Sequence, residues 1–138
     1  MPTESIPAGL AALVAYDGRR GAAENAEEMT AAAAAVSTGE VTRASRDVEL
    51  NGLTIRHGDW LGLADGEPVA GGDDFAEVAF GVVGRLLAEP RALLTLLTGA
   101  EPPPLDGLVD RLTSAHPGLE VEVHEGGQPH YPLLLGAE

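Results

Sequence analysis

The stretch LEVEVHEGGQPHYPLLL, from Leu119 to Leu135, decides the end of the fold. Apolar and polar residues alternate from 119 to 124, which predicts a half-buried strand. Leu133–Leu135 predicts a second strand, and the two together form a terminal hairpin. The connection, Gly126–Pro129, combines two glycines, an amide and a proline, more special backbone chemistry than a plain connection needs.

Length and charge limit the function before any motif is considered. The chain has 138 residues, which is the size of one domain with a proper core. Its formal net charge of −14 argues against binding to nucleic acid or to an anionic membrane, because both need clustered cations. There is no Cys, so disulfides, thiolate metal sites and a Cys nucleophile are excluded. Without a signal peptide or a long apolar run, we expect a cytoplasmic, soluble domain.

The remaining elements follow from periodicity, propensity and turn signals. Ile6–Tyr16 predicts a short buried helix, with Ser5 as its N-cap and Pro7 in its first turn. Ala22–Val36 predicts a second helix, which Ser37-Thr38-Gly39 ends. From Glu40 the period changes to two, and Asn51-Gly52 indicates a tight hairpin.

A third helix from Asp73, an apolar central strand over Arg91–Thr98 and a fourth helix over Leu105–Leu112 precede the terminal hairpin. The predicted order is ααβββαβαββ. The fold class is therefore α+β, with a mostly antiparallel or mixed β-sheet and helices packed mainly on one face.

Two groups of residues invite a chemical interpretation. His124, Glu125 and His130 suggest a metal site, but their spacing is not His-Glu-x-x-His and no further ligand is evident, so we favour solvent-facing residues of a loop and a strand edge. His57-Gly58-Asp59 suggests half of an acid–base pair, but it also has the composition of a turn, which we favour.

Nucleophilic and nucleotide chemistry find no support either. Thr3, Ser5 and Ser45 lack the context of a nucleophile elbow. A Walker-type loop is excluded because all eight basic residues are Arg. The residues alone therefore predict a binding or interaction module with no catalytic residues and no metal site.

Three segments together resemble a known family. They are PTESIPAGLAALVAYD (2–17), VSTGEVTRASRDVELNGLTIRHGDWLGLADGEPVA (36–70) and LEVEVHEGGQPHYPLLL (119–135). In this order they resemble the C-terminal part of the dihydroxyacetone-kinase-like proteins, the ATP-binding subunits of bacterial fatty acid kinase. That region is in turn distantly similar to the C-terminal domain of DegV-like fatty-acid-binding proteins.

The resemblance implies a division of labour. In that family, ATP and Mg²⁺ belong to a separate helical kinase domain, whose metal-binding aspartates have no counterpart here. No cofactor is therefore expected in this chain. Residues 1–38 would be the remainder of a truncated Rossmann-like half, and residues 39–138 would form the α+β sheet domain. With that half absent, Leu10, Leu13 and Val14 should be exposed, and self-association through them is expected to be feasible.

The resemblance also implies an interface. Its residues would be Thr3, Ser5, Gly126, Gly127, Gln128 and Pro129. The glycines would let a neighbour approach closely, and Gln128 would offer a donor and an acceptor. The alternative is that the loop only packs within the fold.

Three functional hypotheses follow from these observations. In the first, a non-catalytic domain docks the DegV-like fatty-acid-binding partner and the remainder of its own chain. The second hypothesis is a small-molecule or fatty-acid pocket within the domain, and the third, the least supported, is an independent hydrolase or phosphatase.

Overall fold

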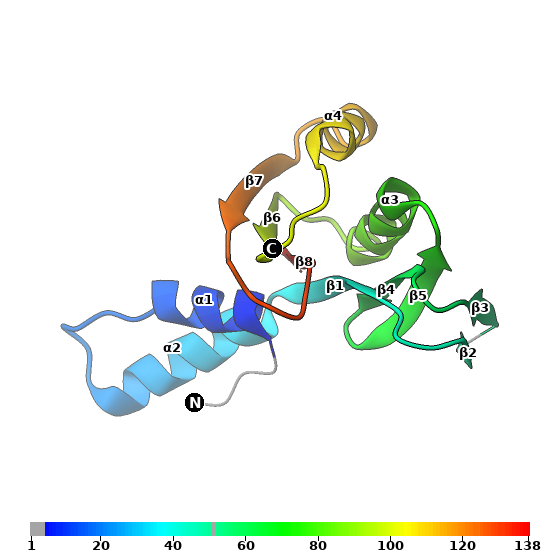
Figure 1. Cartoon of the computed structure of the whole chain (residues 1–138). Helices are drawn as coiled ribbons and strands as arrows, with labels where there is room; N and C mark the ends of the chain where they lie inside the picture. The colour runs from blue at the N-terminus through cyan, green and yellow to red at the C-terminus, as the bar shows by residue number, and fades with distance from the viewer. Residues whose placement is uncertain (1–4, 51) are drawn as a thin grey trace.

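The computed structural model describes residues 5–50 and 52–138 and confirms the α+β class (Figure 1). Its helices are α1 (Ile6–Val14), α2 (Ala22–Ala34), α3 (Phe75–Leu86) and α4 (Asp106–Ala115). Its strands are β1 (Ser37–Arg43), β2 (Val48–Leu50), β3 (Leu53–Ile55), β4 (Trp60–Ala64), β5 (Glu67–Gly72), β6 (Leu93–Thr98), β7 (Glu120–Glu125) and β8 (Leu133–Ala137).

A six-stranded mixed sheet organises the molecule, in the order β5-β4-β1-β8-β6-β7. The β6–β7 pair is parallel, and the other pairs in the described sheet are antiparallel. The predicted long hairpin is interrupted on both arms, so β2 and β3 form a small separate ladder at its tip. Leu50 pairs with Leu53 across a two-residue connection in which Gly52 has φ +80°, as a tight turn requires. Asn51 lies outside the described residues.

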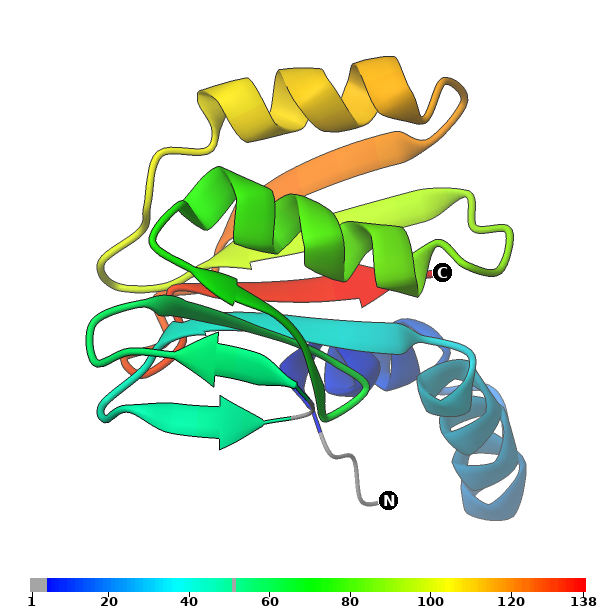
Figure 2. The ribbon, with the colours of Figure 1, turned by 90° about the vertical axis from the view of Figure 1, so that its right-hand side faces the viewer.

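One face of the sheet is closed by α3 and α4, which lie in front of it in Figure 2. The Asp74 side chain caps α3, one residue later than the predicted Asp73, by accepting from the N–H groups of Ala76 and Glu77. The apolar stripe of α3 and the inward residues of the strands form the core, which includes Val41, Val78, Val82, Leu86, Leu94, Leu96, Leu108, Leu112, Leu133 and Leu135.

Two strand glycines let α3 approach the sheet closely. A Cβ at Gly62 would overlap Cγ2 of Val82, and a Cβ at Gly39 would lie 2.7 Å from Cγ1 of the same valine.

The interpretation of Ser37-Thr38-Gly39 as the end of the second helix is wrong. The helix α2 ends at Ala34, and residues 37–39 already belong to β1, so the expected domain division between 38 and 39 falls inside a strand.

On the opposite face, α1 packs against β8 and β1, behind the sheet in Figure 2. A Cβ at Gly136 would lie 2.8 Å from Cβ of Pro7, so this glycine sets how closely α1 approaches β8. The helix α2 packs along α1. The buried Asn25 of α2 holds the loop between α1 and α2 in place. Its side chain accepts from the Asp17 N–H at 3.0 Å and donates to the Asp17 carbonyl at 2.9 Å.

The expected terminal hairpin is absent. The strand β6 lies between β7 and β8 and pairs with both, in parallel with β7 and antiparallel to β8. The helix α4 makes the crossover from β6 to β7, and the loop after β7 passes over the end of β6 to reach β8. Because β7 and β8 are neighbours in the sequence, we expected them to pair with each other. Instead β6, which is more apolar than β7, lies between them.

Candidate functional site

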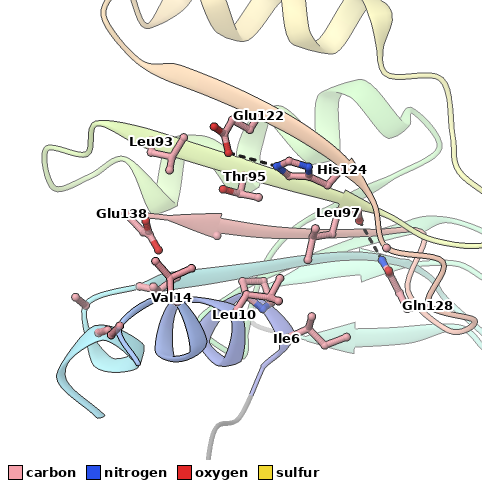
Figure 3. A pocket seen from close by; sticks show the side chains of 18 of the residues that line it. Ile6, Leu10, Val14, Leu93, Thr95, Leu97, Glu122, His124, Gln128 and Glu138 are labelled. Carbon is pink, nitrogen blue, oxygen red and sulfur yellow. Dashed lines mark hydrogen bonds and ion pairs between the residues drawn. The ribbon is translucent and has the colours of Figure 1, made fainter. Parts of the chain in front are cut away.

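An open groove of about 970 Å³ lies between α1 and the uncovered face of β8, β6 and β7 (Figure 3). The C-terminal turn of α2 contributes to its wall, and the loop after β7 borders it at one end. Most of its surface is aliphatic. The groove exists because α1 covers β8 and β1 but stops short of β6 and β7.

The helix α1 supplies one aliphatic wall. Ser5 starts the helix by accepting from the Ala8 N–H at 3.2 Å, which fixes the direction in which its side chains project. Ile6, Leu10 and Val14 are four residues apart, so they form one stripe, and Figure 3 shows this stripe facing the groove. Val14 is 87% exposed. The prediction that Leu10, Leu13 and Val14 are exposed is confirmed. The prediction of a buried helix is wrong, because α1 buries only Pro7, Ala8 and Ala12 on its inner side.

The strands β6 and β7 supply the opposite wall. Leu94 and Leu96 point into the core, so the alternate residues Leu93, Thr95 and Leu97 face the groove. Glu122 and His124 of β7 lie beside Thr95 and Leu97 in the parallel register. The His124 Nε2 atom is 3.3 Å from the Glu122 carboxylate.

The charged side chains around the groove are acidic. Glu122, Glu125 and Glu138 border it, together with His124. In the described part of the chain, neither Arg nor Lys lines this groove. The electrostatic potential in the groove is therefore negative, as is the overall charge of −14, and it favours the binding of cationic groups.

The Gly126–Pro129 loop is held by the end of β6. The N–H groups of Gly126 and Gly127 both donate to the Thr98 carbonyl, at 2.8 and 3.0 Å. Gly127 has φ +69°, a region that favours glycine. The side-chain amide of Gln128 donates to the carbonyls of Leu97 and Tyr131, at 3.0 Å each. Gln128 is thus half-buried and already used within the fold, while it also borders the groove.

A second, more polar cavity of about 620 Å³ lies on the other side of this loop. Pro129 lines it, together with Pro102–Pro104, His130, Arg43 and Trp60. The Arg43 guanidinium already has partners within the fold, because it stacks 4.0 Å over the Trp60 ring and donates to the Gly58 carbonyl at 2.8 Å. The two sides of the loop therefore face different chemical environments.

The remaining predicted residues are separated from one another. Thr3 lies outside the described residues, and Ser5 acts as the cap of α1. The segment His57-Gly58-Asp59 is the expected turn, in which Asp59 accepts from the Arg56 N–H at 3.0 Å and Gly58 has φ +88°. Across residues 5–50 and 52–138, no group of three His, Asp or Glu side chains is placed to hold a metal ion. Within the same ranges, every helix lacks the combination of length and apolar character that crossing a membrane requires.

A pocket within the domain was one of the hypotheses, but its position on the β6–β7 face was not predicted from the sequence. The run from Arg91 to Thr98 suggested burial on both sides, and the structure buries only one side of β6 completely. Thr95, a polar residue inside this apolar run, was the available signal that one face is more open.

Comparison with known proteins supplies the context for the groove. All 138 residues match the family of C-terminal domains of FakA-like fatty acid kinase subunits. The chain belongs to this family. An uncharacterized protein of Staphylococcus haemolyticus is 38% identical over 140 residues, and relatives from Staphylococcus epidermidis and Staphylococcus aureus are 34% identical.

These matches cover the whole of this chain but only 25–26% of each relative. The chain thus spans about a quarter of the length of the relatives it matches. It corresponds to the C-terminal domain of the FakA-like family, and the resemblance of its three sequence segments to that family is confirmed.

Proposed function

We propose that this domain is a non-catalytic docking module of a fatty acid kinase subunit. It would bind the acyl-carrying, DegV-like fatty-acid-binding partner and contact the remainder of its own polypeptide. Phosphate transfer from ATP to the acyl group would then take place on the separate ATP-binding domain, which would also hold Mg²⁺.

One observation carries this proposal, namely the aliphatic groove along α1. Ile6 and Leu10 are 49% and 44% exposed, and Val14 is more exposed still. Leaving contiguous aliphatic surface in water is unfavourable, and such surfaces on soluble domains typically mark interaction sites. Because the relatives are about four times as long, other domains and their partners are available to cover this surface.

Docking is tested by competition. The isolated domain, added in excess to the full-length subunit, should bind the acyl-loaded partner and inhibit its phosphorylation by removing it from the kinase. Calorimetry measures the binding directly, and the kinase assay measures the inhibition. Failure of both would contradict the docking role.

The absence of catalysis is tested separately. Incubated with ATP, Mg²⁺ and the acyl-loaded partner, the domain alone should form no acyl phosphate, because phosphoryl transfer needs a phosphate-binding loop and metal ligands. The full-length subunit is the positive control. Stoichiometric acyl phosphate from the domain alone would assign it the kinase activity.

A second candidate function is acyl binding by the groove itself. Its volume of about 970 Å³ is within the range of ligand pockets, and its aliphatic lining is typical of them. Direct titration with palmitate separates this function from protein docking.

A further inference from the structure

The uncovered face of β6 and β7 is unusual for strands of this type. Parallel strands are normally covered on both faces, because the crossover helix takes one face and other helices take the second. Here α4 covers one face of the β6–β7 pair. On the other face, Leu93, Thr95 and Leu97 line the groove beside α1 (Figure 3). In residues 5–50 and 52–138, no helix covers this face completely.

An α-helix fits this position better than a strand does. Over the flat face of a sheet, the backbone groups of the strands are already paired with one another, so an added strand would leave its own N–H and C=O groups without partners. A helix satisfies these groups internally. A helix of about 13 residues is about 20 Å long. The six residues of β6 span about 20 Å, so the lengths match.

The charges around the groove select among apolar occupants. A fatty acid would bring a carboxylate next to Glu122, Glu125 and Glu138, with no Arg or Lys among the described lining residues to compensate it. A helix with aliphatic residues on one side and Lys or Arg along its edges would match both the lining and its acidic border. Electrostatic complementarity therefore favours a basic amphipathic helix over an acyl chain.

We infer that the groove between α1 and the β6–β7 face is the binding site for a basic amphipathic helix of the partner protein. This inference rests on the proposed docking function and specifies where and how the partner binds. Ile6, Leu10 and Val14 contact one side of the helix, and the half-buried Leu93 and Thr95 contact its underside. Glu122 and Glu138 pair with cationic residues at its edges.

The first test places a charge on the aliphatic wall and measures affinity for the acyl-loaded partner by calorimetry. Val14→Glu should weaken binding by at least about tenfold, because it puts a carboxylate into an apolar contact. Leu13→Glu is the matched control, since Leu13 is on the same helix and 65% exposed but does not line the groove. Equal affinities of the two variants, both folded by circular dichroism, would overturn the inference.

The second test concerns the acidic border. The double variant Glu122→Gln and Glu138→Gln should weaken binding and reduce its dependence on salt concentration, because it removes two charged contacts. Glu27→Gln on the exposed side of α2 leaves the groove intact and serves as the control. Unchanged affinity and salt dependence in the double variant would contradict the charge argument.

The third test uses defined probes. Synthetic 16-residue helices of Leu, Ala and Lys, with their leucines on one face, are titrated into the domain and followed by amide NMR shifts. The basic helices should shift residues of α1, β6 and β7 and displace the partner. Their Glu-for-Lys counterparts and palmitate should bind much more weakly. Tighter binding of palmitate would assign the groove to the acyl chain and overturn the inference.

The inference and the docking function fail in different ways. If the partner binds normally to Val14→Glu and the basic helices do not displace it, docking stands and the groove assignment is wrong. If the basic helices bind in the groove but the partner does not bind the domain, the docking function is wrong, and with it the identity of the occupant.

Discussion

The two faces of one sheet are built in opposite ways. On the α3–α4 side, the glycines of β1 and β4 accommodate valines of α3, and the core residues Leu94, Leu96, Leu133 and Leu135 are almost fully excluded from water. On the α1 side, aliphatic residues of the helix remain half to fully exposed, and β6 and β7 are only partly covered. The closed face contains most of the buried core and so stabilises the fold. The aliphatic residues of the open face are not part of that core, so they are free to contact other molecules.

The sharpest test of this contrast compares two truncations. Leu135→Ala removes a fully buried side chain from the closed face and should cost about 2–5 kcal/mol of unfolding free energy. Val14→Ala removes aliphatic atoms from the open face and should change stability by no more than about 0.5 kcal/mol. Urea unfolding of both variants measures the difference. Similar losses would mean that α1 contributes to the core as much as β8 does.

The tight packing of α3 against the sheet is tested by replacing a strand glycine with a larger residue. Gly62→Val would make the new side chain overlap those of Val82 and Val78, so it should destabilise the fold by about 1–3 kcal/mol or more. Gly84→Ala on the exposed side of α3 meets nothing within 4 Å and should stabilise the helix by about 0.5–1 kcal/mol. Thermal unfolding compares the two. A neutral Gly62→Val would show that α3 can move away from the sheet.

The sequence predicted the local elements better than their partners. The cap at Ser5, the turn at Gly52 and the apolar stripe of α3 depend on neighbouring residues, so they were readable from spacing alone. The pairing of β6 with both β7 and β8 depends on distant segments. The roles of Gly39 and Asn25 are equally non-local: one lies under α3, and the other anchors a loop eight residues away.

The candidate site was predicted only in part. The exposure of α1 followed from the resemblance to a longer family, because its apolar residues by themselves predicted a buried helix. The interface assigned to Gly126–Pro129 stays a prediction, and the structure adds that Gln128 has a role within the fold. The open face of β6 was missed, because the polar Thr95 on that face was outweighed by the leucines on both sides of it.

Gln128 connects the two regions and gives the next largest expected effect. Gln128→Ala removes the donor to the carbonyls of Leu97 and Tyr131, so it should cost about 1–2 kcal/mol of stability. This differs from the expectation for a purely exposed interface amide, whose loss would leave stability intact. Urea unfolding and partner affinity should be measured together. Lowered stability with unchanged affinity would make the loop a packing element alone.

The smallest expected effect concerns the connection between α1 and α2. The Arg19 guanidinium donates to both carboxylate oxygens of Asp17, at 3.1 and 2.9 Å. This hydrogen bonding, together with the Arg19 N–H, lowers the pKa of Asp17 below its usual value of 3.8 and raises the pKa of Arg19. Because the folded pKa is the lower one, the pair stabilises the fold above the unfolded pKa, and this contribution is lost as the pH falls through the folded pKa.

The comparison of wild type with Asp17→Asn isolates this contribution. Above about pH 5 the variant should have a slightly lower Tm, because surface ion pairs contribute little. The difference should diminish as the pH falls below 4 and as salt concentration rises, since protonation and screening both remove the attraction. The same substitution should leave Leu135→Ala as costly as before, because the two sites share no contacts. A Tm difference that persists in acid would show that Asp17 acts through its hydrogen-bonding geometry and not through its charge.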